Sequence, residues 1–486
     1  MPGVPTGRAC DACRKQKKKC DEKQPTCSRC ARLKVKCVGS GIQRFKFQEE
    51  KRFSPPKREQ SNNTKLEAVS PDSTGSSRTH VITTRPIRHI YMHVPPGTPS
   101  PGPSNELTYL TSAFVKTIKR STDLRYNLWW SFGFFLEDVP RRLGTNEALD
   151  RAIDAMTTAH GDFCTRHIVS VDALAKYSQA LRTLHVYLDD MAHAQSSSTL
   201  CAVMVLLVCQ LFLGPTTQCW SGHAEGAASI LKARKSFGPR DNFERKMFLS
   251  LRGTVLFEGL FNHRIDLTPE EWTDLVTNDF DAQTPEGQML QCLSHAPGLM
   301  RRRRAALQTE ADTTEVRDEV WTIYQHCKTN LSTLHLRATE NDFSGIDMSQ
   351  MSAGDRASVR SFMYAHHERS YGLGLAISLF FNCLLGAVGA HDGASLFDAK
   401  YLTEEVLALA DRSAIWRPIG TGYLIICFSF AWTATTDPQL RAKLLATFND
   451  YSSDLRVCDS QFMMNELDRF AEHMRLGTPF RIRAET

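Results

Sequence analysis

Six cysteines near the amino end are the residues of this chain whose type and spacing point most directly to chemistry. The pattern C-x2-C-x6-C occurs twice there, the second copy 17 residues after the first. The cysteines are Cys10, Cys13, Cys20, Cys27, Cys30 and Cys37. Zinc in a closed structural site takes four ligands, and thiolates suit it well. Six sulfurs complete two such sites only if two of them bridge both ions, and the repeat makes Cys10 and Cys27 the candidates.

Two other interpretations of these cysteines have to be weighed. A disulfide framework is one, because small cysteine-dense segments often contain one. The start of the chain, MPGVPTGRAC, has no apolar signal-peptide core, which argues against an oxidising compartment. A structural zinc module without a nucleic-acid role is the other. The density of charge argues against it, because five of the six residues from Arg14 to Lys19 are Lys or Arg.

The basic charge of the whole chain is concentrated in the same segment. The 486 residues carry a formal net charge of +6, yet residues 1–60 contain 17 Lys and Arg against 6 Asp and Glu, a net +11. The remainder therefore carries −5. This asymmetry predicts a polyanionic partner for the amino-terminal segment alone. The other nine cysteines are scattered without a C-x2-C pair, and we interpret them as small buried apolar residues.

The segment from Cys10 to Cys37 resembles the fungal binuclear zinc cluster family of DNA-binding transcription factors. Besides the cysteines, the shared residues are Arg14, Lys17, Lys19 and Pro25. The resemblance implies two Zn²⁺ ions per chain, bridged by the first and fourth cysteines. It also implies a nuclear fungal protein that binds double-stranded DNA at CGG-like half-sites, often as a homodimer. Gln16 departs from the family, which usually has a basic residue there; Gln can donate a hydrogen bond to a base but adds no charge.

The resemblance further implies that the first helix of the cluster carries its basic end to the major groove. We expect Lys17 to contact a base edge, with Gln16 and Lys18 beside it, because O6 and N7 of guanine accept hydrogen bonds from lysine. Phosphate contacts position a protein without reading sequence. The residues expected to make them are Arg14, Lys19, Arg32 and Lys34.

Composition divides the chain into five parts, and the predicted fold class is mainly α. Residues 1–9 are expected to form a flexible arm before the zinc cluster of residues 10–37. Residues 38–53 alternate aromatic and basic side chains, so they either pack on the cluster or follow the phosphate backbone. Residues 54–104 are rich in Pro, Ser and Thr, a composition typical of a disordered linker. Residues 105–475 are expected to form a large all-α regulatory domain.

Several signals support helices in the large domain. Residues 200–213 are apolar on nearly all sides and stop at Gly-Pro, which predicts a buried central helix. The run Thr268-Pro269-Glu270-Glu271 has the features of a helix start. Leu149–Met156 share a helical face that is expected to close at Gly161. Two uncharged stretches, residues 372–390 and 418–436, approach the length of a membrane span, and we interpret them as buried helices.

Residues 220–234 resemble a recurring helix of the fungal-specific transcription factor regulatory domain. The shared residues are Trp220, His223, Gly226, Ala227 and Arg234. Gly226 and Ala227 are expected to let another helix approach closely. His223 is interpreted as a hydrogen-bonded core residue rather than a ligand. The resemblance extends more loosely over residues 105–470.

Motifs of enzymes are absent from the sequence. It contains no H-E-x-x-H, G-x-S-x-G, phosphate-binding G-x-x-x-x-G-K or dinucleotide glycine pattern, so the protein is not expected to be an enzyme. His366, His367 and Glu368 are interpreted as a solvated polar group. The run Arg301–Arg304 is either a nuclear localisation signal or an exposed basic turn, and residues 15–19 are a second import candidate.

The sequence therefore predicts a nuclear, zinc-dependent, sequence-specific regulator of transcription by RNA polymerase II. By resemblance its targets are metabolic or secondary-metabolite genes, and its partners include the transcription machinery. The alternative is a helical ligand- or protein-binding scaffold whose zinc module makes non-specific contacts with nucleic acid.

Overall fold

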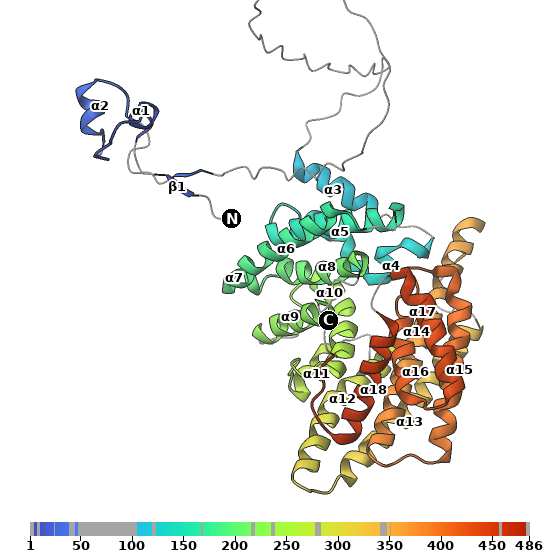
Figure 1. Cartoon of the computed structure of the whole chain (residues 1–486). Coiled ribbons are helices and arrows are strands. Elements are labelled where there is room, and N and C mark those ends of the chain that lie inside the picture. Colours follow the sequence, from blue (N-terminus) through green and yellow to red (C-terminus); the bar gives the residue numbers. More distant parts are fainter. Residues whose placement is uncertain are drawn as a thin grey trace, which may run out of the picture. The chain divides into compact units, whose positions relative to one another are not determined.

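The computed structural model divides into two compact units, residues 1–95 and 96–486, which are described separately (Figure 1). The described residues are 4–6, 10–23, 25–37, 44–46, 105–118, 123–166, 169–214, 219–234, 239–277, 283–340, 348–349, 351–455 and 459–482. The predicted linker, residues 54–104, lies outside them, so its disorder stays a prediction.

The described residues of the first unit form two short helices and two short strands. Helix α1 (Asp11–Lys15) and helix α2 (Ser28–Arg32) each begin at a C-x2-C pair. Strand β1 (Val4–Thr6) pairs antiparallel with strand β2 (Arg44–Lys46), with Pro5 opposite Phe45. This pairing lies within the segments predicted as an arm and as a basic and aromatic segment. It was not expected, because strands of three residues leave no alternating pattern to detect.

The second unit is helical, which confirms the predicted mainly α fold class. Its α-helices are α3 (Glu106–Thr117), α4 (Leu128–Phe132), α5 (Glu147–Arg166), α6 (Val171–Leu188), α7 (Met191–Ala194), α8 (Ser197–Leu213), α9 (Cys219–Ala233), α10 (Asn242–Phe261), α11 (Pro269–Val276), α12 (Pro285–Gln308), α13 (Thr314–Glu340), α14 (Ala353–Ala387), α15 (Gly393–Ser413), α16 (Leu424–Ala434), α17 (Pro438–Leu455) and α18 (Ser460–Leu476). The 3-10 turns among the described residues are η1 (Leu124–Tyr126), η2 (Phe134–Glu137), η3 (Val139–Arg141) and η5 (Ala414–Trp416).

Helix α8 is the buried helix that the sequence predicts in the amino-terminal half of this unit. The Ser196 hydroxyl caps its start by accepting from the Thr199 N–H, and the helix ends at Gly214, where φ is +77°. It packs against α5, α6 and α9. The prediction that α5 closes at Gly161 is wrong, because the helix continues to Arg166. A glycine inside a helix costs only about 1 kcal/mol, which the packing of a long helix offsets.

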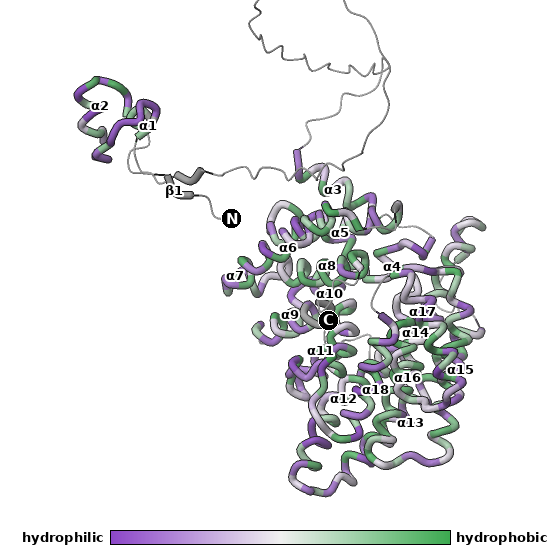
Figure 2. Tube along the Cα trace, viewed as in Figure 1, coloured by the Kyte–Doolittle hydropathy of each residue, from purple (hydrophilic) through white to green (hydrophobic). Residues whose placement is uncertain are grey.

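Helices α14 and α16 include most of the two uncharged stretches and lie at the centre of the carboxyl-terminal half. Helix α14 packs along α13, α15 and α16. Among the described helices it has the length and apolarity of a membrane span (Figure 2). However, 78% of its most apolar window is buried inside the protein. Such burial indicates a core helix, because a membrane-spanning helix exposes its apolar side chains to lipid.

The helix start at Thr268 and the core histidine match their predictions, and two further helices have aspartate caps at their starts. Thr268 and Glu271 form a reciprocal capping box at α11, and the side chain of Asp241 caps α10. Asp437 accepts from backbone N–H groups at the start of α17. His223 is buried and lies 2.9 Å from the Tyr177 hydroxyl through Nε2.

Two predictions about polar and small residues are wrong. A Cβ added at Gly226 would meet nothing within 4 Å, so this glycine does not admit a neighbouring helix, although Ala227 beside it is buried. His367 and Glu368 are buried rather than solvated. The reason is Arg412 on α15, whose guanidinium lies 3.1 Å from the Glu368 carboxylate and pairs with it inside the fold.

The run Arg301–Arg304 lies within α12 rather than in an exposed turn. Arg303 is only 6% exposed and donates to backbone carbonyl oxygens of Ala387, Met474 and Arg475. These carbonyls belong to the last turns of α14 and α18, where the helix dipoles favour a cation. Because Arg303 is buried, the folded protein does not present this run as a continuous basic signal.

Candidate metal centre and nucleic-acid interface

The structure brings the six predicted zinc ligands together in the first unit. Two sets of four sulfurs have all their members within 4.8 Å of one another. The sets are Cys10, Cys13, Cys20 and Cys27, and Cys10, Cys27, Cys30 and Cys37. Cys10 and Cys27 belong to both sets, and each stands at the start of one half of the sequence repeat.

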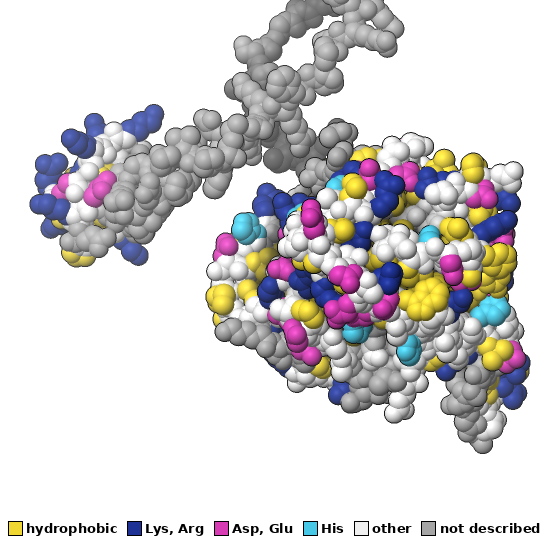
Figure 3. Space-filling model, turned by 90° about the horizontal axis from the view of Figure 1, so that it is seen from below, with side chains coloured by type: hydrophobic (Ala, Val, Ile, Leu, Met, Phe, Trp, Pro, Cys, Tyr) yellow, Lys and Arg dark blue, Asp and Glu magenta, His cyan; other side chains and the backbone are white. Residues whose placement is uncertain are grey.

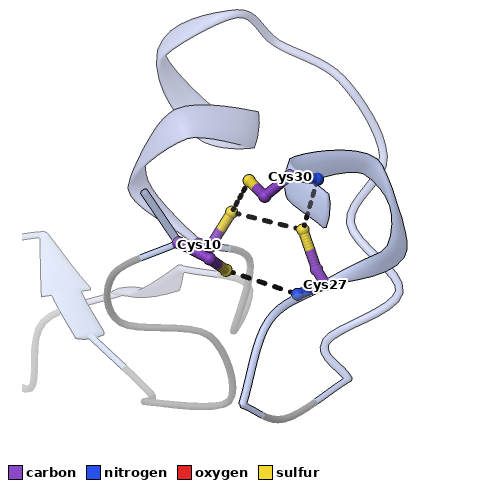
Figure 4. Close-up of side chains that lie close together, drawn as sticks. Cys10, Cys27 and Cys30 are labelled. Atoms are coloured by element: carbon purple, nitrogen blue, oxygen red, sulfur yellow. Dashed lines mark hydrogen bonds between the residues drawn. The ribbon is translucent and has the colours of Figure 1, made fainter. Parts of the chain in front are cut away.

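The sulfur–sulfur separations have the size that zinc requires. A zinc–sulfur bond of about 2.3 Å sets the edge of a tetrahedron of sulfurs at about 3.8 Å. The Cys10 Sγ lies 3.7 Å from the Cys27 Sγ and 3.6 Å from the Cys30 Sγ (Figure 4). The Sγ atoms of Cys13 and Cys27 are 3.8 Å apart. A disulfide would bring two sulfurs to about 2.05 Å, and none of the six cysteines forms one.

Backbone N–H groups point at the sulfurs in both halves of the repeat. The Cys10 N–H donates to the Cys20 Sγ at 3.5 Å, and the Cys27 N–H donates to the Cys37 Sγ at 3.4 Å. These two contacts are equivalent under the 17-residue repeat. Hydrogen bonds to a thiolate stabilise its negative charge and orient it toward a metal.

The same geometry distinguishes the two shared cysteines from their neighbours. A backbone N–H from Cys13 lowers the pKa of Cys10 to about 6, and the Cys30 N–H, which donates to the Cys27 Sγ at 3.4 Å, lowers the pKa of Cys27. Burial instead raises the pKa of Cys13 to about 11 and also raises that of Cys30. Cysteines bind metals as thiolates. The fold therefore favours the thiolate most at Cys10 and Cys27, the two cysteines that belong to both sulfur sets.

A second-repeat residue, Arg29, makes a contact that the sequence does not predict. Its Nη2 donates to the Gln16 Oε1 at 2.7 Å, and its Nη1 lies 4.0 Å from the Cys13 Sγ. Arg29 therefore links α2 to the end of α1 and brings a positive charge to a predicted metal ligand. Gln16, where the family usually has a basic residue, supplies the acceptor that lets a guanidinium lie there without repulsion.

The predicted DNA-contacting residues whose side chains the structure describes are all exposed. They are Gln16, Lys17, Lys18, Lys19, Arg32 and Lys34. The side chain of Arg14 lies outside the described part of the chain. Figure 3 shows Lys and Arg side chains gathered over the visible face of this unit, with few acidic ones among them. One of the acidic residues, Asp21, accepts from the N–H of Ser28 at 3.0 Å, and hydrogen bonds from Ser28 lower the pKa of Asp21.

Comparison with known proteins agrees with the site. Residues 8–45 match the family described as the fungal Zn(2)-Cys(6) binuclear cluster domain. The segment is a binuclear zinc cluster. Its cofactor is Zn²⁺, with two ions per chain, and the two sets of four sulfurs fit them.

The reported similarities each cover a small part of the chain. Over 50 residues the chain is 50% identical to the ABC-transporter-regulating transcription factor of Aspergillus fumigatus. The aligned segment makes up 10% of this chain and 5% of that protein. The chain thus covers about a twentieth of the length of that relative. No solved structure matches the chain. The resemblance of residues 105–470 to a fungal regulatory domain stays a prediction.

Proposed function

We propose that this protein is a zinc-dependent, sequence-specific DNA-binding regulator of transcription that acts in the nucleus and is not an enzyme. The observation that carries the proposal is the position of exposed basic side chains at the end of α1, directly after a helix that begins at the pair Cys10 and Cys13. A helix presented in this way can enter the major groove with its end held rigidly. The 50-residue similarity to a transcription factor supports the same function.

The six cysteines are proposed as the ligands, with Cys10 and Cys27 bridging both ions. Their membership of both sulfur sets supports this assignment. Because so small a module has almost no apolar core, zinc binding and folding of the cluster are one event. Zinc thus acts as a structural element that holds α1 and α2 in place.

The exposed residues at the end of α1 are proposed to read DNA. Lys17 contacts a base edge, and Lys18 lies beside it. Gln16 accepts from Arg29 through its Oε1, which leaves its amide N–H groups as donors to a base or a phosphate. The proposed phosphate contacts come from Arg14, Lys19, Arg32 and Lys34.

Double-stranded DNA with CGG-like half-sites is the proposed partner, bound by a monomer or a homodimer, and the transcription machinery is the second. The proposed targets are metabolic or secondary-metabolite genes of RNA polymerase II. Selection of bound sites from a random DNA pool with the full-length, zinc-loaded protein tests the proposal. We expect one enriched motif that contains a CGG-like triplet. A scaffold with non-specific nucleic-acid contacts would retain DNA but enrich no motif.

A further inference from the structure

A large cavity lies inside the helical unit. Its volume is about 1030 Å³, and its wall is formed by residues of α4, α8, α9, α10, α12, α13, α14, α16, α17 and α18, with turn residues between them. Most of the lining is apolar, as with Leu207 on α8, Phe257 on α10 and Ile377 on α14. Ligand pockets in proteins have volumes of roughly 300–1000 Å³ and apolar walls with a few placed polar groups. The cavity therefore has the size and character of a small-molecule site.

The polar group that would orient a ligand in this cavity is the guanidinium of Arg369 on α14. Its Nη1 donates to the Trp130 carbonyl oxygen at 2.8 Å, and its guanidinium lies 4.3 Å from the centre of the Trp130 ring. Neither contact neutralises the charge. No carboxylate lies within ion-pair distance of Arg369 among the residues that the structure describes. Burial lowers the pKa of Arg369 to about 10, as expected for a cation that has lost water without gaining an anion.

Three other charged residues on the cavity wall form ion pairs. Lys246 pairs with Asp138 at 2.7 Å, Glu286 with Arg337 at 3.3 Å, and Arg481 with Glu225 at 3.6 Å. Glu368, the carboxylate next to Arg369 in sequence, forms an ion pair with Arg412 instead. A half-buried cation without an anion costs stability, because no ion pair offsets the water that it has lost. An anion entering the cavity would complete the pair.

A neutral donor lies close to this cation in sequence. His366 lines the same cavity from the turn of α14 before Arg369. Burial, followed by the charge of Arg369, lowers the pKa of His366 to about 3, so its ring is neutral at pH 7. The ring then offers one N–H donor without a second positive charge. A guanidinium and a neutral imidazole suit a single carboxylate better than a phosphate group of higher charge.

Glu258 limits the number of charges that a ligand can carry. It lines the cavity from α10. Burial raises the pKa of Glu258 to about 7, so at neutral pH it is partly ionised. A second carboxylate in the same cavity would meet this acidic group and lose its own hydration.

We propose that the cavity binds an apolar monocarboxylate, with its carboxylate on Arg369 and its apolar body in the remainder of the cavity. The proposal does not rest on DNA binding, since the cavity lies within the helical unit. A DNA-free binding measurement therefore separates its failure from failure of the proposed function.

The test is calorimetric titration of the full-length protein with dodecanoate and with dodecanol, which has the same chain without the charge. We expect saturable binding of one dodecanoate per chain, and an affinity for dodecanol lower by a factor of about 10 or more, the usual size of a charge-assisted hydrogen bond. Equal affinities, or no saturable binding of dodecanoate, would overturn the proposal.

Arg369→Gln locates the carboxylate. It should reduce the affinity for dodecanoate to that for dodecanol and leave dodecanol binding unchanged. Arg245→Gln is the matched control, because Arg245 lies on α10, is exposed and does not line the cavity. Equal losses for acid and alcohol in Arg369→Gln would mean that the residue shapes the cavity instead of pairing with the anion. If Arg369→Gln does not fold, the comparison of acid with alcohol in the unaltered protein still decides the proposal.

Discussion

Lys17 and Lys34, 17 residues apart, end the two helices of the zinc cluster with the same left-handed backbone turn. Their φ angles are +51° and +48°. In each half the N–H of the following residue donates to the carbonyl oxygen of the second cysteine, at 2.9 Å for Cys13 and 3.1 Å for Cys30. Glycine is the usual residue at this place in a helix end. A lysine there costs about 1 kcal/mol or more in backbone strain, so we infer that the side chains are retained for a contact outside the cluster.

Substitution of these two lysines distinguishes a contact with a base, which gives sequence specificity, from a contact with a phosphate, which does not. Lys17→Ala should cost roughly 1–3 kcal/mol on the selected DNA site alone, because it removes a base contact. Lys34→Ala should weaken binding to every sequence about equally and lower the salt slope by about one, because it removes a phosphate contact. Alanine keeps the strained backbone, so both variants isolate the side chain. The measurement is titration of the selected site and a scrambled site at several salt concentrations.

Glycine at the same positions gives a matched control. Lys17→Gly should lose the same DNA specificity as Lys17→Ala but hold zinc against a chelator more strongly, because glycine relieves the left-handed strain. Equal losses on both DNA sites for Lys17→Ala would place that side chain at a phosphate.

Gln16 tests the contact between the two cluster helices. Gln16→Arg should tighten binding to the selected and scrambled sites and raise the salt slope by about one, because it adds a cation near the phosphates. It also replaces the acceptor of Arg29 with a second guanidinium, so Arg29 should leave its place beside Cys13. Gln16→Leu is the control, which removes the acceptor without adding charge and should leave the salt slope unchanged. A salt slope that does not move in Gln16→Arg would show that position 16 faces away from DNA.

The zinc content of cysteine variants distinguishes cysteines that belong to both sulfur sets from those that belong to one. We expect two zinc ions per chain by elemental analysis. Cys27→Ser should disturb both ions because Cys27 belongs to both sulfur sets, whereas Cys13→Ser should disturb one. Chelation of the metal should abolish DNA binding and leave the helical signal of the second unit intact. Retention of one tightly bound zinc by Cys27→Ser, with a second lost, would argue against a bridging role.

The zinc centre was predictable because its ligands are close in sequence and their spacing is set by the helices that they begin. The contact between Gln16 and Arg29 was not predictable, since it joins residues of opposite halves and depends on how the halves pack. For the same reason β1 and β2 escaped prediction, because their pairing joins segments on either side of the cluster.

In the helical unit, apolar spacing predicts which residues are buried but not how charged residues are placed. Residues 366–368 look like a solvated group until Arg412 from a distant helix pairs with Glu368. The cavity leaves no local pattern either, because its wall comes from ten of the described helices. Helix starts were predictable, since a cap such as Thr268 contacts only its own first turn.

Burial of His223 should make stability depend on pH. Burial lowers the pKa of His223 to about 4, below the usual value of about 6.5, so the unfolded chain binds a proton more readily than the folded one between these values. The stabilisation is therefore complete above pH 6.5 and is lost as pH falls toward 4. This one group should account for about 2 kcal/mol of lost stability between pH 7 and pH 5.

Urea unfolding at pH 7 and pH 5 checks the expectation for His223. His223→Gln, which can still hydrogen-bond with Tyr177, should remove that part of the pH dependence. An exposed histidine gives the control, and His185→Gln should leave the dependence as it is. An unchanged pH dependence in His223→Gln would show that His223 is protonated in the folded protein.

Arg303 should be the member of the run Arg301–Arg304 on which folding depends. Its guanidinium donates to carbonyl oxygens of Ala387 at 2.7 Å and Arg475 at 2.6 Å, and also to that of Met474. Arg303→Met would leave these helix-end carbonyls buried without a donor, which should cost about 3 kcal/mol or more in the free energy of unfolding. Burial lowers the pKa of Arg303, in keeping with a cation that has exchanged water for carbonyls.

Arg302→Met provides the comparison for Arg303→Met. Arg302 is exposed and pairs with Glu319 at 2.6 Å on the surface, and such pairs contribute about 0–1 kcal/mol. Both variants remove one positive charge from the same helix, so they change the net charge and any import signal equally. Urea unfolding followed by circular dichroism measures both. Equal stability of the two variants would mean that water replaces Arg303 at the ends of α14 and α18, whereas a large difference would show that one buried arginine holds the two helix ends together.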